Sequence, residues 1–389
     1  MPLVRPVAKT SKAYYLLFAL LLVAVGVGFK LFSHASGVAT AFEAESGART
    51  SPASLISSTT ASGQSAVRFT GPCTGATPPA HYKHVIWIWN ENKDNGAVDQ
   101  SANAPFVNQI ASQCSKATNV IDNATTVALP SEPQYAVATS GSNCNTGIDT
   151  ATGSGTGCLR TDGDHAAASL DSESIFQLAK NSSMSWKSYI ESMPSNCSLA
   201  SSGRYAYKHN PAAFYNPIAA DCAINDVGIP AITCSTTVGL GCSGTPSNTF
   251  TADIASGSLA NFTFITPNLD NDMHDGTVAE GDNWLKTYVP LITAGPNYAS
   301  GDTAIFIMWD EGSANSGTAS NIPSVVIAPS IKPGTVVTTA TNNIGILRTT
   351  EQILGLSPYL GCASGVAPGG ATNCSAGSNV SIAAADNLQ

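Results

Sequence analysis

Acidic residues gather around one histidine, His274, in the segment NLDNDMHDGTVAEGD (268–282) of a chain in which only 11% of residues are charged. These acidic residues are Asp270, Asp272, Asp275, Glu280 and Asp282. The apolar run FTFI at 262–265 predicts a buried strand and leaves the acidic segment in the loop that follows it. Such a loop could bind a cation, although an acidic loop is often only a solvated surface.

Two more apolar runs end in side chains that can bind a metal. HVIWIW (84–89) leads to Glu91 and Asn92, and TAIFIMW (303–309) leads to Asp310 and Glu311. Carboxylate and carboxamide oxygens are typical ligands of a hard divalent cation such as Mg²⁺ or Ca²⁺. Because α/β folds bind ligands at the carboxyl ends of central strands, these residues are candidate metal ligands.

A serine held between prolines is the candidate nucleophile. Ser131 lies in LPSEP (129–133), and the small residues that follow it allow close packing behind it. A metal beside this hydroxyl would lower its pKa and favour the alkoxide. The alternative is an ordinary proline turn, and the chain contains no G-x-S-x-G elbow.

The elements that must position these residues indicate an α/β fold. The continuous apolar run at 84–89 is typical of a strand buried on both faces of a sheet, and the segments 303–309 and 324–328 predict further strands. Helices are predicted at 104–113, from 174 to 179, and at 343–356. Residues 197–250 are rich in Cys, Gly, Pro and Thr and predict a loop-rich excursion pinned by disulfides.

Several segments also occur in the order of a known family. They are HVIWIWNEN (84–92), PSEPQYAVATSG (130–141), SWKSYIESMPSNC (185–197), YAYKHNPAAFY (205–215), FITPNLDNDMHDGTVAEGDNWL (264–285), IFIMWDEG (305–312) and LRTTEQILGL (347–356). The chain resembles the secreted phosphoesterases that include acid phosphatases and non-haemolytic phospholipases C, a branch of the alkaline-phosphatase superfamily. Colinear motifs of this length are much more specific than any one motif alone.

The resemblance implies an alkaline-phosphatase-like three-layer sandwich, with a central mostly parallel sheet and helices on both faces. It also implies a phosphoric ester hydrolase that forms a phosphoserine intermediate and uses one divalent ion, Ca²⁺, Mg²⁺ or Zn²⁺. Implied roles are metal binding by Glu91, Asn92, Ser131, Asp310 and Glu311, catalysis by Ser131 and His274, and phosphate contacts by His209, Asp270 and Asp272.

This chain departs from the family pattern at three positions. Leu129 and Asn343 stand where the family commonly has histidine, and Gln134 replaces the more usual asparagine. Fewer histidines leave less positive charge for the phosphoryl group. The leading interpretation is hydrolysis of phosphomonoesters or phospholipid head groups, and the alternative is a surface binding protein that keeps the fold with weak or no turnover.

The sequence divides into four parts. Residues 1–41 join a basic start to an apolar run and the A-x-A site at 39–41, which fits a cleaved signal peptide or an uncleaved membrane anchor. A Ser/Thr/Gly-rich linker with a FEAESG strand signature follows at 42–79, then the phosphoesterase domain at 80–362. Residues 363–389 form a Gly/Ala/Ser-rich tail that is predicted to be loose beyond Cys374.

Charge and cysteine content limit the partners and the compartment. A net charge of −9 with few scattered Lys and Arg argues against nucleic-acid binding. Ten cysteines could form up to five disulfides, with Cys144–Cys158 and Cys234–Cys242 as the natural close pairs. We expect an extracellular or cell-surface monomer that acts on a small phosphoester and associates with the membrane only through its N-terminal segment.

Overall fold

The computed structural model of the chain describes residues 53–57, 65–69, 71–122, 130–142, 162–164, 170–244, 246–313, 320–366, 374 and 376–389. The predicted leader, the FEAESG motif, Leu129 and the predicted pair Cys144–Cys158 lie outside these residues. In the predicted linker, strands β1 (Ala53–Ser57) and β2 (Ser65–Phe69) form a small two-stranded sheet. No helix in the described ranges combines the length and apolar character needed to cross a membrane.

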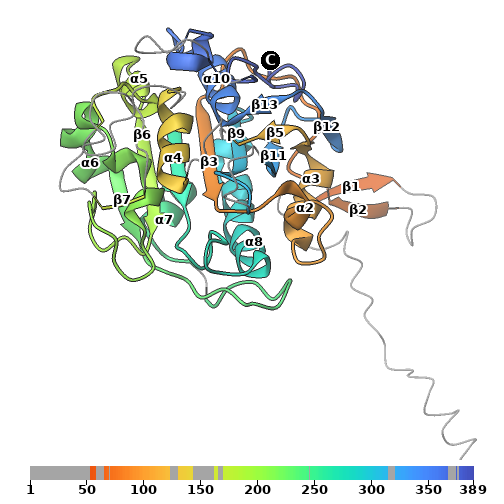
Figure 1. Cartoon of the computed structure of the whole chain (residues 1–389). Helices are drawn as coiled ribbons and strands as arrows, with labels where there is room; N and C mark the ends of the chain where they lie inside the picture. The colour runs from red at the N-terminus through yellow and green to blue at the C-terminus, as the bar shows by residue number, and fades with distance from the viewer. Residues whose placement is uncertain are drawn as a thin grey trace, which may run out of the picture. The chain divides into compact units, whose positions relative to one another are not determined.

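A mostly parallel sheet forms the centre of the main unit (Figure 1). Its eight described strands run in the order β12 (Thr335–Val337), β4 (Ser115–Ala117), β11 (Ser324–Ile327), β9 (Thr303–Trp309), β3 (His84–Asn90), β8 (Phe262–Thr266), β6 (Trp186–Glu191) and β7 (Asp226–Ile229). Only β11 among them runs against its neighbours. Strands β8 and β9 are buried along their whole length, as their mostly apolar sequences predict.

The strand register shows that helices cover both faces of this sheet. Trp87 of β3 pairs with Phe306 of β9 and donates to Thr350 of helix α10 (Asn343–Leu354) at 2.9 Å. Val325 of β11 pairs with the residue after Phe306, so its side chain points to the other face. There it lines a small cavity with Val107 of helix α3 (Pro105–Gln113). The predicted three-layer α/β architecture is confirmed.

The remaining elements surround this core. The helices are α2 (Asn95–Val98), α4 (Ser131–Ser140), α5 (Ile175–Asn181), α6 (Ala219–Asn225), α7 (Thr249–Ser256), α8 (Val278–Ala294) and α9 (Pro296–Ala299). Short 3-10 helices are η3 (Tyr207–His209), η4 (Pro211–Ala213), η5 (Asn216–Ile218) and η6 (Gly361–Ser364). A three-stranded sheet joins β10 (Asn321–Ile322), β5 (Val120–Ile121) and β13 (Thr341–Asn342).

Helix α8 begins inside the segment predicted to be a loop, so Glu280 and Asp282 lie on a helix. Thr277 N donates to Glu280 Oε2 at 2.7 Å, and Glu280 N donates to Thr277 Oγ1 at 3.2 Å. This reciprocal capping box is encoded locally as Thr-x-x-Glu before an apolar run. The prediction of a continuous loop was wrong because the capping box starts the helix at Val278.

The Cys-rich excursion is pinned by Cys197–Cys222 and by the predicted pair Cys234–Cys242. It also supplies β7, the last strand of the central sheet, which the lack of apolar periodicity did not predict. Two other described disulfides, Cys73–Cys114 and Cys362–Cys374, hold the two ends of the main unit.

The C-terminal segment packs against the core, in contrast to the loose tail predicted beyond Cys374. Ile382 and Leu388 are fully buried. Asn387 Nδ2 also donates to Ser330 O at 2.6 Å. Two well-placed apolar side chains therefore order a segment whose overall composition is typical of a flexible tail.

Candidate active site

The carboxyl ends of β3, β8 and β9 meet at one edge of the sheet, because these strands are parallel neighbours. Glu91 follows β3 directly, Asp310 follows β9, and Asp272 lies in the loop after β8. Glu91 N donates to Asp272 O at 2.8 Å, and Asp310 N donates to Asn90 O at 3.1 Å. Three fully buried carboxylates, distant in sequence, therefore lie side by side.

Ser131 is the first residue of helix α4, every residue of which is buried. Its Oγ donates to Glu91 Oε2 at 3.0 Å and lies 3.4 Å from Glu311 Oε1. Pro130 precedes it in an extended conformation and leads the chain into the helix. The hydroxyl thus faces the strand-end carboxylates from the positive end of a helix, which favours negative charge on its oxygen.

Asn92 connects the β3 end to the β9 end through its backbone. Its φ of 48° is in the left-handed region, which asparagine tolerates better than most residues, and its N donates to Asp310 Oδ1 at 3.1 Å. Asn92 Oδ1 and Asp310 Oδ2 are buried and make no hydrogen bond to any described residue. Buried polar atoms without a partner are costly, so these two oxygens are available for a ligand.

The buried carboxylates of this site also repel one another, and their pKa values are raised. Burial, then the charges of Asp310 and Asp272, raises the pKa of Glu91 well above its usual range. Burial raises the pKa of Asp310 to about 6, and burial with the charge of Asp310 raises the pKa of Glu311 to about 9. A divalent cation would relieve both the desolvation and the repulsion, so the predicted oxygen ligands fit one.

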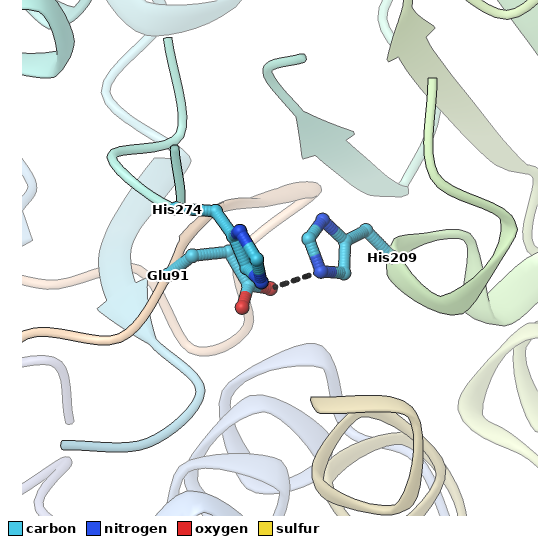
Figure 2. Close-up of side chains that lie close together, drawn as sticks. All are labelled: Glu91, His209 and His274. Carbon is cyan, nitrogen blue, oxygen red and sulfur yellow. Dashed lines mark ion pairs between the residues drawn. The ribbon is translucent and has the colours of Figure 1, made fainter. Parts of the chain in front are cut away.

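His209 of η3 contacts two carboxylates, that of Glu91, which Figure 2 shows beside it, and that of Asp272. Its Nδ1 lies 3.1 Å from Asp272 Oδ2, its Nε2 lies 3.3 Å from Glu91 Oε1, and only 2% of the side chain is exposed. Burial lowers the pKa of His209 well below its usual range, with the charges of Lys208 and His274 acting in the same direction. The imidazole therefore bridges the two carboxylates, with one ring nitrogen beside Glu91 and the other beside Asp272.

His274 approaches Glu91 from a different segment, the loop after β8 (Figure 2). Its Nδ1 lies 2.7 Å from Asp275 Oδ1, and its backbone N donates to Asp272 Oδ1 at 2.7 Å. Its Nε2 lies 3.2 Å from Lys208 Nζ. Asp275 thus fixes the ring, and the distal nitrogen is directed toward the centre of the site.

Asp270 is engaged outside this group of residues. Its carboxylate pairs with Arg204, which also reaches Asp275 Oδ2 at 2.9 Å. No described hydrogen bond links Asp270 to His209 or His274. Its predicted contact with phosphate stays a prediction, and the visible role of Arg204 and Asp270 is to hold the loop that carries His274.

A second group of potential ligands shares Glu91 with the first. One atom each of Glu91, His209 and His274 lie within 4.8 Å of one another. Two imidazoles beside a carboxylate are typical of Zn²⁺ ligands, whereas the oxygen set around Asp310 suits Mg²⁺ or Ca²⁺. No sequence motif groups the two histidines with Glu91, because the three residues come from segments far apart in the chain.

Tyr135, one turn after Ser131 on α4, is a site residue that the motifs did not single out. Its hydroxyl donates to Glu91 Oε1, and its ring stacks on His209 with centroids 5.5 Å apart. The i, i+4 spacing from Ser131 on one helix face was the available signal.

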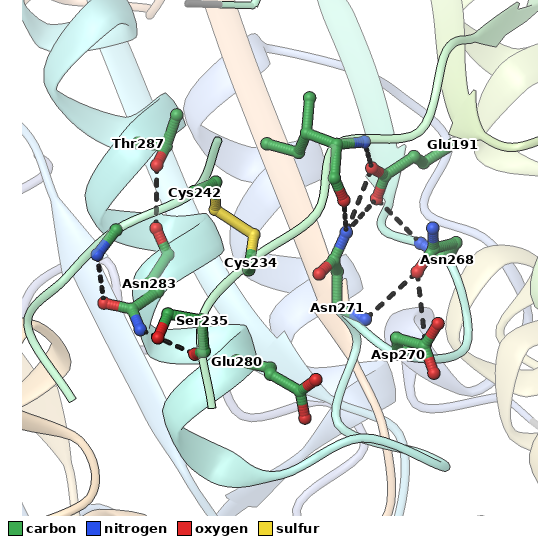
Figure 3. The surroundings of a disulfide bond; sticks show 12 residues. Glu191, Cys234, Ser235, Cys242, Asn268, Asp270, Asn271, Glu280, Asn283 and Thr287 are labelled. Atoms are coloured by element: carbon green, nitrogen blue, oxygen red, sulfur yellow. Dashed lines mark hydrogen bonds between the residues drawn. A yellow bond between two sulfur atoms is a disulfide. The ribbon is translucent and has the colours of Figure 1, made fainter. Parts of the chain in front are cut away.

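Polar side chains outside the site anchor the loop that carries Asp272 and His274 (Figure 3). Asn271 Nδ2 donates to both oxygens of buried Glu191 at 3.0 Å, and Asn268 N donates to Glu191 Oε2 at 3.0 Å. Asn283 of α8 binds the backbone of Ser235 and Gly241, inside the loop that the Cys234–Cys242 disulfide closes. Asn271 Nδ2 also donates to Ile232 O of the excursion at 3.0 Å, so both β6 and the disulfide-pinned excursion hold the loop.

The fold and this edge of the sheet define a class of enzyme. Residues 70–357 match the model of the phosphoesterase family, so the chain belongs to that family and is a phosphoric ester hydrolase. It is 28% identical over 316 residues to a phosphatidylinositol-3-phosphatase of Mycobacterium tuberculosis, covering 81% of this chain and 90% of that protein.

Two further similarities are more distant. The chain is 25% identical to a phosphate-repressible acid phosphatase of Penicillium chrysogenum over 58% of its own length and 47% of that protein, so it spans about half of the fungal enzyme. A solved protein of the alkaline phosphatase superfamily from Vibrio parahaemolyticus superposes with a TM-score of 0.47 at 14% identity, covering 73% of this chain and 69% of that one.

Proposed function

We propose that this enzyme hydrolyses phosphomonoesters by transferring the phosphoryl group to Ser131 and then to water. The observation that carries the proposal is the position of Ser131 Oγ, 3.0 Å from Glu91 Oε2 at the amino end of a buried helix. Phosphomonoesters are favoured over phospholipid diesters because the relatives reported above are named as phosphatases.

Ser131 forms the first bond of the reaction. The positive end of α4 favours its alkoxide, and its proton leaves along the hydrogen bond to Glu91. The Oγ–P bond forms as the bond from phosphorus to the leaving oxygen breaks. His274, held through Nδ1 by Asp275, gives the leaving oxygen a proton and afterwards takes one from the attacking water. The bond from this water to phosphorus forms as the Oγ–P bond breaks, and Glu91 returns the proton to Ser131 Oγ.

A divalent cation would be held by Glu91, Asn92, Asp310 and Glu311, with Ser131 beside them. When bound, it would neutralise phosphoryl charge and lower the pKa of the Ser131 hydroxyl. The unpartnered oxygens of Asn92 and Asp310 and the raised pKa values of the carboxylates support this assignment. Whether the ion is Ca²⁺, Mg²⁺ or Zn²⁺ is decided by adding each back to chelated protein.

The test compares the full-length wild type with Ser131→Ala on p-nitrophenyl phosphate and p-nitrophenyl phosphorylcholine, with and without chelator. Loss of the nucleophile should lower kcat by at least about 10³-fold, and the chelator should abolish turnover reversibly. Mass spectrometry of acid-quenched wild type should find phosphate on Ser131. Ser140→Ala, at the far end of the same helix, is the matched control and should retain turnover.

Turnover that is unchanged both by the chelator and by the Ser131→Ala substitution would refute this mechanism. Preference for the phosphorylcholine ester would move the assignment from monoesters to phospholipid head groups. An absence of turnover on both esters in protein with bound metal would favour the binding-protein alternative.

We further propose that the enzyme is exported as a monomer. The four described disulfides agree with an oxidising compartment, and the N-terminal 41 residues carry the predicted signal or anchor. Fractionation of the native host, followed by sequencing of the mature N-terminus, tests export and distinguishes cleavage from anchoring.

A further inference from the structure

Two adjacent residues of η3, Lys208 and His209, point their side chains to different surroundings. His209 is enclosed by Glu91 and Asp272, so both ring nitrogens already face carboxylate oxygens. Lys208 instead reaches the wall of a cavity of about 410 Å³ that also contains His274. Of this pair, the residue with access to a ligand in the cavity is therefore the lysine.

The Lys208 ammonium lies between an anion and the proposed proton donor. Its Nζ is 2.8 Å from Asp162 Oδ2 and 3.2 Å from His274 Nε2, and its side chain is only 20% exposed. The two nitrogens lie next to each other on the wall of one cavity, so an anion in the cavity can accept from the Lys208 ammonium and, when the ring is protonated, from His274 Nε2 as well. A phosphoryl group carries several oxygens and meets that requirement.

Asp162 links Lys208 to the nucleophile helix. Its Oδ1 accepts a hydrogen bond from Glu132 N at 3.0 Å, one residue after Ser131, while its Oδ2 pairs with Lys208. The lysine is thus tied to the start of α4 by one carboxylate. Burial alone lowers the pKa of Lys208, but the bond and charge of Asp162, with Glu91 and Asp310, raise it overall, so the side chain is an ammonium.

The other cations near the site are committed to protein oxygens. Lys93 Nζ donates to Met273 O at 2.7 Å and to Asn92 O at 3.2 Å. Arg204 is shared between Asp270 and Asp275. Among the described lysines and arginines around these carboxylates, Lys208 is the one that lines the cavity with His274.

We propose that Lys208 binds the phosphoryl oxygens of the substrate, together with His274, and that it contributes the fixed positive charge of the phosphate subsite. The proposal rests on the phosphoester hydrolysis proposed above, and it adds a substrate-binding residue to that site. An ammonium in a partly desolvated cavity stabilises the charge that develops on the phosphoryl oxygens.

The test measures binding of inorganic phosphate to the full-length, cation-supplemented protein by calorimetry, beside kcat/KM for p-nitrophenyl phosphate. Lys208→Met should weaken phosphate binding at least about tenfold and lower kcat/KM by about 10²-fold. Lys208→Arg should restore most of both, because it returns the charge. Lys180→Met removes another lysine paired with an aspartate, Asp221, and should change neither.

Asp162→Asn tests whether phosphate binding depends on the Lys208 charge itself or on the ion pair of Lys208 with Asp162. This variant breaks the pair with Lys208 but keeps an oxygen for Glu132 N, so phosphate should bind equally or more tightly. Phosphate affinity within about twofold of wild type in folded Lys208→Met overturns the proposal. The proposal is also overturned if Asp162→Asn loses as much phosphate affinity as Lys208→Met. A wild-type protein that does not bind phosphate at millimolar concentration overturns it as well.

These outcomes are distinct from failure of the proposed hydrolysis. That failure is a lack of turnover by wild type, and calorimetry still measures the Lys208 effect on phosphate binding in its absence. Circular dichroism melts of each variant identify any misfolded protein before binding is compared.

Discussion

Tyr135 helps to fix the orientation of the Glu91 carboxylate. One Glu91 oxygen accepts the Tyr135 hydroxyl and faces His209, and the other accepts Ser131. Glu91 is therefore positioned by contacts from α4 and η3 before any ligand binds. Partners of this kind orient a metal ligand, and their loss commonly weakens metal binding.

Tyr135→Phe should accordingly lower the affinity for the divalent cation by about 10–100-fold, while the ring stays stacked on His209. Titration of chelated protein with the cation, by calorimetry and by recovery of activity, measures the effect. Tyr298→Phe is the matched control, because that hydroxyl donates to Pro72 O at 2.8 Å in another part of the main unit. An unchanged affinity in Tyr135→Phe would show that the hydroxyl does not orient Glu91.

The loop between β8 and α8 is the element on which His274 depends. Asp275 N donates to Leu269 O at 2.9 Å, and this turn brings Gly276 against the backbone of Asp270. A Cβ added at Gly276 would lie 1.9 Å from Asp270 O, a distance that requires the backbone to move. Glycine is thus required there by a close approach of two chain segments.

Gly276→Ala should displace His274, two residues away, and lower kcat/KM by on the order of 10²-fold, since small misplacements of catalytic groups are costly. The melting temperature should fall as well. Gly96→Ala on α2 is the control, because a Cβ there would meet no atom within 4 Å. Wild-type kinetics in Gly276→Ala would mean that the turn adapts without moving His274.

At the scale of the whole molecule, buried carboxyl groups outside the site make stability depend on pH. Burial raises the pKa of Asp386 to about 7, and its carboxylate accepts a hydrogen bond from Ser115. Because the folded pKa is higher than the unfolded value of about 3.9, the stabilisation from this group is complete below pH 3.9 and is lost as pH rises through 7.

Asp386→Asn should remove that loss, so the variant should gain stability relative to wild type between pH 4 and pH 8. At pH 8 the gain should be on the order of 4 kcal/mol in the free energy of unfolding, because a rise from about 3.9 to about 7 is roughly three pKa units and each unit corresponds to about 1.4 kcal/mol. Urea titrations at both pH values provide the measurement. A difference between variant and wild type that stays constant with pH would contradict the assignment.

The central strands and the order of their polar ends could be predicted from the sequence. A strand buried on both faces is encoded by its own apolar residues, so the runs before Glu91 and Asp310 were visible locally. The same locality explains the predicted helices α3 and α10. The start of α8 is also encoded locally, by the capping box of Thr277 and Glu280.

Only the tertiary structure decided which side chains meet. Ser131 contacts Glu91 because α4 begins at the carboxyl end of β3, and no local pattern encodes that packing. In the same way, the orientation of η3 decides that His209 joins the buried carboxylates while Lys208 lines the cavity. The sequence determined the chemical groups through local residue patterns, whereas their pairing depends on contacts between segments far apart in the chain.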